Sequence, residues 1–105
     1  MRVAIYVRVS TQRQAQTQTI EQQLEQLRTH SQTHGWLWRE EHIFRDDGYS
    51  GASLQRPGLD RLRDQVRGAK FDRVVITEPS RLARKYVHQM LLIEELERGG
   101  CQVEC

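Results

Sequence analysis

Hydrophobic residues recur along the chain in segments that alternate between two spacings. Short runs rich in β-branched side chains predict four strands, at residues 2–9, 37–44, 71–77 and 101–105. Apolar residues at helical spacing predict three helices, at residues 20–34, 57–68 and 81–98. The resulting order, β-α-β-α-β-α-β, is typical of an α/β domain whose largely parallel central sheet is flanked by helices.

Local signals indicate where the predicted helices begin. Thr19 is followed three residues later by a glutamine, as in a capping box, and Pro57 suits the first position of the second helix. Ser80 is expected to cap the third helix. The polar segments 11–19 and 45–56 are expected to be loops.

The ends of the strands are the places to look for chemistry. In open parallel sheets, ligands bind at the carboxyl ends of the strands. In this chain the first predicted strand ends at Ser10, and the third ends at residues 77–80. Residues around these two points are therefore the candidates for a functional site.

Composition narrows the class of protein without identifying a partner. The 105 residues include 37% hydrophobic residues and carry a formal net charge of +2. The apolar runs fall far short of the ~18 residues of a membrane span, and no signal peptide is recognisable. Cys101 and Cys105 are expected to be small core residues in a reducing cytoplasm. We therefore expect a cytoplasmic protein.

Arginine supplies 14 of the 16 basic residues. Its planar guanidinium group matches the oxygens of a phosphate, whereas lysine offers only a point charge. A net charge of +2 is too small to indicate nucleic-acid binding. The positions of the arginines must therefore decide whether the chain binds an anion.

The first candidate group lies on the first predicted strand. Alternation places Tyr6, Arg8 and Ser10 on one face. A guanidinium group is costly to bury unless an anion pairs with it, and a phosphate would serve. The alternative is that Arg8 pairs with a carboxylate and Ser10 caps a turn, and the pattern leaves both interpretations open.

The second candidate group is a pair of arginines after the third predicted strand. Arg81 and Arg84 are three residues apart at the expected start of a helix, where the dipole and free N–H groups attract anions. The alternative is a solvated basic face. Arg56, just before the second helix, is a weaker candidate by itself.

Other polar and aromatic groups favour structural roles. His30 and His34 are four residues apart on a predicted helix, but no third metal ligand is evident, so surface histidines are expected. Trp36 and Trp38 are expected to pack against the core rather than to stack on bases. The sequence has no Gly-x-x-x-x-Gly-Lys phosphate loop, which argues against nucleotide hydrolysis.

Five short motifs follow one another along the chain. They are Tyr6-Val7-Arg8-Val9-Ser10-Thr11, Thr19-Ile20-Glu21-Gln22-Gln23, Asp46-Asp47-Gly48-Tyr49-Ser50-Gly51, Arg56-Pro57-Gly58-Leu59 and Ser80-Arg81-Leu82-Ala83-Arg84. This series resembles the catalytic domain of serine recombinases, the resolvase/invertase family, and it looks closest to the large serine recombinases or resolvases of mobile elements. The resemblance covers essentially the whole chain and implies a three-layer resolvase-like fold.

The resemblance also implies a reaction. Ser10 would cleave a DNA phosphodiester through a 5′-phosphoserine intermediate, and the strands would be rejoined after subunit rotation, without a metal or another cofactor. The residues that match the family's active-site arginines are Arg8, Arg56, Arg81 and Arg84. Gln18 and Gln23 match glutamines near the nucleophile. Weaker positional matches are Tyr6, Asp46 and Ser50.

Ser80 departs from the family pattern, which usually has aspartate before the first arginine of the Arg-Leu-x-Arg motif. Serine caps a helix well but supplies no negative charge. Either Asp46 or Asp47 substitutes in part, or the chain is a catalytically impaired member that acts as an oligomerisation or DNA-assembly module.

The expected partners follow from the resemblance as well. They are double-stranded DNA and further copies of the chain, in a homodimer and a synaptic homotetramer. Residues 1–105 are expected to form a catalytic domain that is incomplete at its C-terminus, with the DNA-recognition domain absent. The third helix carries an apolar set that is either core or a contact between subunits: Val87, Met90, Leu91 and Leu96.

Overall fold

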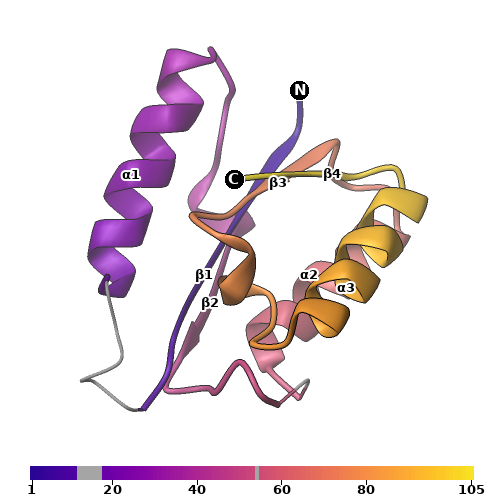
Figure 1. The fold of residues 1–105 in the computed structure, drawn as a ribbon. Coiled ribbons are helices and arrows are strands. Elements are labelled where there is room, and N and C mark those ends of the chain that lie inside the picture. The colour runs from indigo at the N-terminus through magenta and orange to yellow at the C-terminus, as the bar shows by residue number, and fades with distance from the viewer. Residues whose placement is uncertain (12–17, 54) are drawn as a thin grey trace.

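A central strand of seven buried residues, β1 (Val3–Val9), organises the fold. The structure is a computed structural model that describes residues 1–11, 18–53 and 55–105. In this part of the chain the sheet has the order β2-β1-β3-β4, and all its strand pairs are parallel. The remaining strands are β2 (Ile43–Asp47), β3 (Arg73–Val75) and β4 (Gln102–Glu104) (Figure 1).

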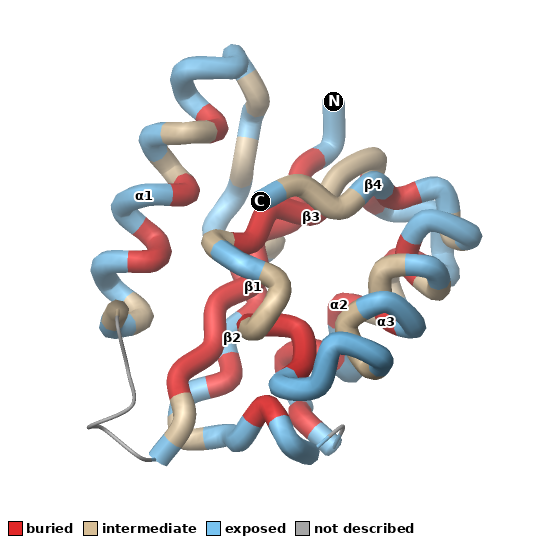
Figure 2. Tube along the Cα trace, viewed as in Figure 1, coloured by how far each residue is buried: buried red, intermediate tan, exposed pale blue. Residues whose placement is uncertain are grey.

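Helices cover both faces of the sheet. Helix α1 (Ile20–Thr33) lies on one face, and α2 (Pro57–Arg67) and α3 (Tyr86–Arg98) lie on the other (Figure 1). Alternate residues of β1 enter two separate apolar clusters, one with α1 and one with α2 and α3. Figure 2 shows the burial concentrated along β1. The predicted three-layer α/β domain with a parallel sheet is confirmed.

The second strand was placed too early by the sequence pattern. Residues 37–44 were expected to be extended, but Glu40–His42 form a short 3-10 helix and β2 begins at Ile43. The alternation of Trp36 and Trp38 suggested a strand, but both side chains pack partly against the apolar cluster between α1 and the sheet without belonging to a strand. Leu37 between them is 84% exposed and forms only an isolated bridge to Arg2.

The strand β2 also runs further than expected, through two aspartates that had been assigned to a loop. Its alternation explains the sequence: Phe44 and Asp46 are buried, whereas Arg45 and Asp47 are exposed. A carboxylate takes a core position here because protein donors satisfy it, as described below. The polar appearance of the segment hid the strand.

The third helix begins five residues later than predicted. Pro79–Arg81 form a short 3-10 helix, and α3 starts only at Tyr86. Ser80 therefore does not cap it; its hydroxyl donates instead to a carboxylate oxygen of Glu78 at 2.8 Å. Arg81 and Arg84 consequently do not share the face of a helix N-terminus, and that argument for an anion site was wrong.

Other boundaries agree with the sequence. Thr19 and Gln22 form the expected capping box, with hydrogen bonds of 3.0 and 3.1 Å between side chain and backbone. The loop expected at 11–19 lies mostly outside the described residues.

Cys101 is buried as expected, but Cys105 is exposed, so only one of the two belongs to the core. None of the helices in the described ranges has the length and apolar content of a membrane span.

Candidate active site

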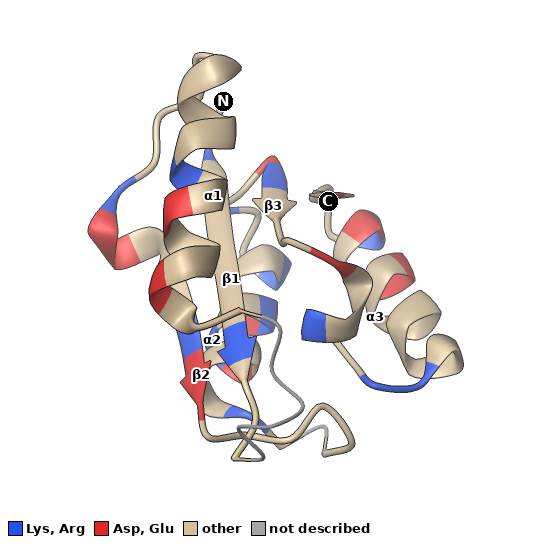
Figure 3. Cartoon of the chain, turned by 60° about the vertical axis from the view of Figure 1, so that its left-hand side comes forward, with Lys and Arg blue, Asp and Glu red and all other residues tan. Residues whose placement is uncertain are grey.

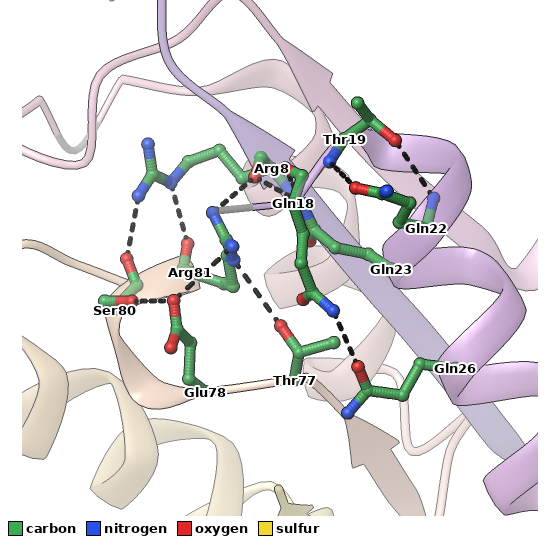
Figure 4. Close-up of polar contacts among 10 residues, drawn as sticks. All are labelled: Arg8, Gln18, Thr19, Gln22, Gln23, Gln26, Thr77, Glu78, Ser80 and Arg81. Atoms are coloured by element: carbon green, nitrogen blue, oxygen red, sulfur yellow. Dashed lines mark hydrogen bonds and ion pairs between the residues drawn. The ribbon is translucent and has the colours of Figure 1, made fainter. Parts of the chain in front are cut away.

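The side chain of Arg8 reaches from β1 to the segment that follows β3. Its guanidinium group donates hydrogen bonds to the carbonyl oxygens of Arg81 at 3.0 Å and Ser80 at 2.8 Å (Figure 4). It also donates to a third carbonyl oxygen, that of Tyr49, at 3.0 Å. Burial and the nearby charge of Arg56 lower the pKa of Arg8. Within the described residues, no carboxylate accepts a hydrogen bond from this guanidinium group, so the carboxylate partner considered from the sequence is not found there. Arg8 thus fixes three loop carbonyls beside the end of β1.

Arg81 binds back to the same strand. Its guanidinium group donates to the carbonyl of Arg8 at 3.2 Å and to the hydroxyl of Thr77 at 3.4 Å, and it lies 3.4 Å from a carboxylate oxygen of Glu78 (Figure 4). The two arginines therefore hold each other's main chain, two residues before Ser10. The positive charge of Arg81 is held there although its side chain is only 7% exposed.

Glu78 is the residue that sequence reasoning missed. It supplies a carboxylate to Arg81 and also accepts a hydrogen bond from the hydroxyl of Ser80. The sequence had pointed to Asp46 or Asp47 as a partial substitute for the aspartate that the serine recombinases, which the chain resembles, usually have at the position of Ser80. A signal was available, since Glu78 stands three residues before Arg81, a spacing at which side chains meet in helical turns.

Gln23 connects α1 to the same strand. Its amide group accepts from the N–H of Arg8 at 3.3 Å and donates to the carbonyl of Arg8 at 3.0 Å, although the side chain is completely buried. It also donates to the carbonyl of Gln18 at 3.4 Å. The side chain of Gln18 points elsewhere, to Gln26 at 2.8 Å (Figure 4). The fold thus joins Gln23 to Arg8, whereas only the backbone of Gln18 takes part.

Arg56, Tyr6 and Asp46 form a second, fully enclosed polar group behind Arg8. The phenol of Tyr6 donates to Asp46 at 2.7 Å and accepts from Arg56 at 3.3 Å. Arg56 also donates to the carbonyls of Arg81 and Leu82. Asp46 accepts the first free N–H groups of α2, from Gly58 at 2.7 Å and Leu59 at 2.9 Å.

These contacts explain why the chain between η3 (Pro79–Arg81) and α3 is not helical. The carbonyls of residues 80 to 83 would bond to N–H groups four residues later in an α-helix. They accept instead from side chains, namely those of Arg8, Arg56 and Gln89. Leu82 and Ala83 are at the same time buried in the core. Buried arginines and packing therefore override the helical pattern of this segment.

Replacing Tyr6 with phenylalanine is expected to make stability less sensitive to alkaline pH. Burial, aided by the hydrogen bond to Asp46, raises the pKa of Tyr6 above its ordinary value of 10.0. Above pH 10 the unfolded chain loses this proton while the folded chain keeps it, so native stability falls as the pH rises, by ~1.4 kcal/mol per pH unit.

The measurement is urea unfolding at about pH 8 and about pH 11, where the stability gap between wild type and the Tyr6→Phe variant should shrink by ~1 kcal/mol. Tyr86→Phe is the matched control, since that side chain is exposed. A gap of constant size at both pH values would show that Tyr6 ionises normally in the folded protein.

Ser10 follows the last residue of β1 and is partly buried. It lines an open cavity of about 590 Å³ between the end of β1, the start of α1 and the end of β2. The other lining residues include Thr19, Glu21, Asp47 and Gly48. In Figure 3 basic positions mark the same end of β1 and the segment before α3.

Two further predicted residues lie at the edge of this region. Arg84 is exposed, and its backbone N–H donates to the carbonyl of Gly51 at 2.9 Å. Ser50 is exposed too, and its hydroxyl accepts from the N–H of Ala52 at 3.0 Å. At Gly51 a Cβ atom would lie 2.8 Å from the guanidinium group of Arg8 and 3.2 Å from the backbone nitrogen of Arg84, so a larger residue would displace one of the two. The loop therefore connects Arg8 with the Arg84 backbone.

Comparison with known proteins gives a consistent result. The model of the family described as "Resolvase, N terminal domain" matches residues 3–105. A protein of Bacillus subtilis (strain 168) described as "Putative DNA recombinase" is 36% identical over 97 residues, which are 91% of this chain and 18% of that protein. The chain thus spans less than a fifth of the length of this curated relative.

Solved structures agree with the family match. The N-terminal catalytic domain of TP901-1 integrase superposes with a TM-score of 0.85 at 29% identity, covering 96% of this chain and 73% of that one. The C-terminal catalytic domain of ISC1926 TnpA, an IS607-like serine recombinase, gives 0.83 at 31% identity, covering 99% and 69%. The chain therefore belongs to the resolvase family of serine recombinases, whose N-terminal domain it matches along nearly its entire length.

Proposed function

We propose that this chain carries the active site of a site-specific DNA recombinase, with Ser10 as the nucleophile. The observation that carries the proposal is an excess of buried positive charge. Three arginines, Arg8, Arg56 and Arg81, are at most 7% exposed, whereas Asp46 is the one buried carboxylate among the described residues. Burying more cationic than anionic side chains is costly, and a bound phosphate would offset the excess of positive charge.

The proposed reaction is a phosphoryl transfer. The Ser10 hydroxyl oxygen attacks the phosphorus of a DNA phosphodiester, and the bond from phosphorus to the 3′-oxygen breaks. The serine loses its proton and the leaving 3′-oxygen gains one, so a 5′-phosphoserine link and a 3′-hydroxyl result. Charge on the phosphoryl oxygens is stabilised by guanidinium groups, for which Arg8, Arg81 and the exposed Arg84 are the candidates.

Rejoining would reverse these steps after one half of the complex rotates. The covalent link keeps the energy of the original phosphodiester, so the reaction needs no external energy source. Gln23 would act as a positioning residue, since it holds the backbone of Arg8 two residues before Ser10. Arg56 would act in the same way, through the loop carbonyls to which it donates.

The experiment is to trap the covalent intermediate. The full-length protein is incubated with a nicked or half-site DNA from which the cleaved strand diffuses away, and the adduct is digested and sequenced by mass spectrometry. The proposal expects a nucleotide attached through its 5′-phosphate to the peptide that contains Ser10. An adduct on another residue, or none under conditions where DNA is bound, would contradict it.

A second candidate function is an assembly module that does not cleave DNA, and the presence of serine at position 80 favours it. Glu78 argues against this alternative, because it already provides Arg81 with a carboxylate at 3.4 Å. The two functions differ in a measurable way, since the assembly module would form complexes on DNA without covalent adducts.

Replacing Glu78 with glutamine in the full-length protein is expected to slow adduct formation about tenfold or more, because Arg81 loses the partner that orients it. DNA affinity at equilibrium should change less than the cleavage rate. Glu97→Gln, at an exposed position of α3, is the matched control. If Glu78→Gln cleaves at the normal rate while Ser80→Asp accelerates cleavage, then Glu78 does not replace the missing aspartate.

We further propose that α3 contacts a second copy of the chain and that the active assembly is a homodimer that pairs into a tetramer on double-stranded DNA, in the cytoplasm. Leu96 is buried in the core, but Val87, Met90 and Leu91 are between 41% and 64% exposed on the same helix. Neighbouring Tyr86 is exposed as well. Apolar side chains grouped on one surface are typical of an interaction site.

A further inference from the structure

Three potential metal ligands meet between α1 and β4. His30 and His34 lie one helical turn apart near the end of α1, and Glu104 is the last residue of β4. One ligand atom from each residue lies within 4.8 Å of the other two. The sequence offered the two histidines without a third ligand, and the fold supplies it from a position 70 residues away in the chain.

The tautomer of His34 suits metal binding. Its Nδ1 lies 2.9 Å from the carbonyl oxygen of His30. A carbonyl oxygen can only accept, so Nδ1 carries the proton in this contact and Nε2 keeps its lone pair. A backbone carbonyl that binds the second ring nitrogen is a common way to orient a metal-binding imidazole.

Glu104 is oriented from the opposite side. Arg73 donates to Oε1 at 2.7 Å, which leaves Oε2 directed at Nε2 of His30, 2.5 Å away. This contact requires a proton between the two atoms. A metal ion that replaced the proton would need roughly 3.3 Å between the two ligand atoms, given bonds of ~2.0–2.1 Å in a tetrahedral site. The Glu104 carboxylate must therefore move by about 0.8 Å, which is within the reach of a partly exposed side chain.

We propose that His30, His34 and Glu104 form a binding site for a divalent transition metal such as Zn²⁺, which joins the end of α1 to the edge strand β4. Two imidazole nitrogens and one carboxylate oxygen are a donor set that zinc favours, and water would complete the coordination. The site is independent of the proposed recombination chemistry, since none of its three ligands belongs to the group around Ser10.

Calorimetric titration of the 105-residue chain with Zn²⁺ tests the proposal. We expect one ion per chain, with the affinity at least about tenfold weaker in His34→Gln and in Glu104→Gln, by analogy with the losses seen when metal-site partners are removed. His88→Gln, on α3, is the control and should bind as the wild type does. Circular dichroism of each variant shows whether it is folded.

The exposed Cys105 adjoins Glu104 and is the main competing ligand. Binding should be unchanged in Cys105→Ser, and the Co²⁺ complex should show visible ligand-field bands without a thiolate charge-transfer band. Loss of binding in Cys105→Ser, or equal binding in wild type and His34→Gln, would overturn the assignment.

Trp36 provides an independent readout in the folded protein. Its ring stacks on that of His34, with centroids 4.6 Å apart, so a paramagnetic ion at the site should quench its fluorescence. In the Trp38→Phe variant, Trp36 is the sole tryptophan. Saturable quenching by Cu²⁺ in Trp38→Phe that is absent from the double variant with His34→Gln supports the site. Quenching that persists in the double variant contradicts it.

Discussion

Replacing Ser10 with alanine in the full-length protein is expected to reduce covalent protein–DNA adducts below detection. The hydroxyl is the only atom of that side chain able to form the phosphoester, and removing a nucleophile costs up to ~10⁶-fold in a hydrolase that works through one. Ser10 follows the strand end and is only partly buried, so the fold should tolerate the loss of its hydroxyl oxygen. The measurement is a denaturing gel of radiolabelled half-site DNA after incubation with protein.

DNA binding should persist in the same variant, because the proposed phosphate contacts come from arginines. Ser53→Ala is the matched control, since Ser53 is an exposed serine in the loop before α2 and should form adducts at the wild-type rate. Adducts that survive denaturation in Ser10→Ala would assign the nucleophile to another residue. Loss of DNA binding together with the adducts would show that Ser10 acts in recognition rather than in bond formation.

The fold class was predictable because hydrophobic spacing reports burial directly. The continuous apolar character of β1 and the helical spacing of α2 both follow from which faces are buried. The segment before α3 was not predictable in this way. Its conformation depends on guanidinium groups from Arg8 and Arg56, which stand 72 and 25 residues earlier than the carbonyls they bind, and local sequence carries no trace of such partners.

In the candidate site, too, local spacing predicted some features, whereas others depend on contacts between distant residues. Alternation alone placed Tyr6 and Arg8 on one face of β1, and the structure confirms that both point to the side of α2 and η3. The role of Asp46 depended instead on long-range pairing. It lies opposite Arg8 in the register of β1 and β2, where its carboxylate reaches the start of α2. Adjacent aspartates in the sequence therefore looked alike although one is buried and one is exposed.

This difference predicts that the loss of Asp46 reduces stability far more than the loss of Asp47. Asp46 is 1% exposed and accepts three hydrogen bonds, from the phenol of Tyr6 and from the N–H groups of Gly58 and Leu59. The last two N–H groups lie in the first turn of α2, where the helix itself offers no acceptor. Arg56, the residue at the N-cap, makes no side-chain cap hydrogen bond, so Asp46 takes over that role. Replacement by alanine would leave buried donors without an acceptor and remove the negative charge beside buried arginines.

We expect Asp46→Ala to lower the free energy of unfolding by ~3–5 kcal/mol, the usual cost of removing one partner of a buried charged group. Small domains have a total stability of ~5–15 kcal/mol, so the variant should lose a large share of its stability and unfold at a clearly lower urea concentration than the wild type. Asp46→Asn keeps one acceptor oxygen and should lose less. Asp47→Ala, the exposed neighbour, should change stability by no more than ~0.5 kcal/mol. If Asp46→Ala and Asp47→Ala lower the free energy of unfolding equally, the carboxylate of Asp46 contributes no more than an exposed one. The positive charge of the buried arginines would then be balanced by a group other than Asp46.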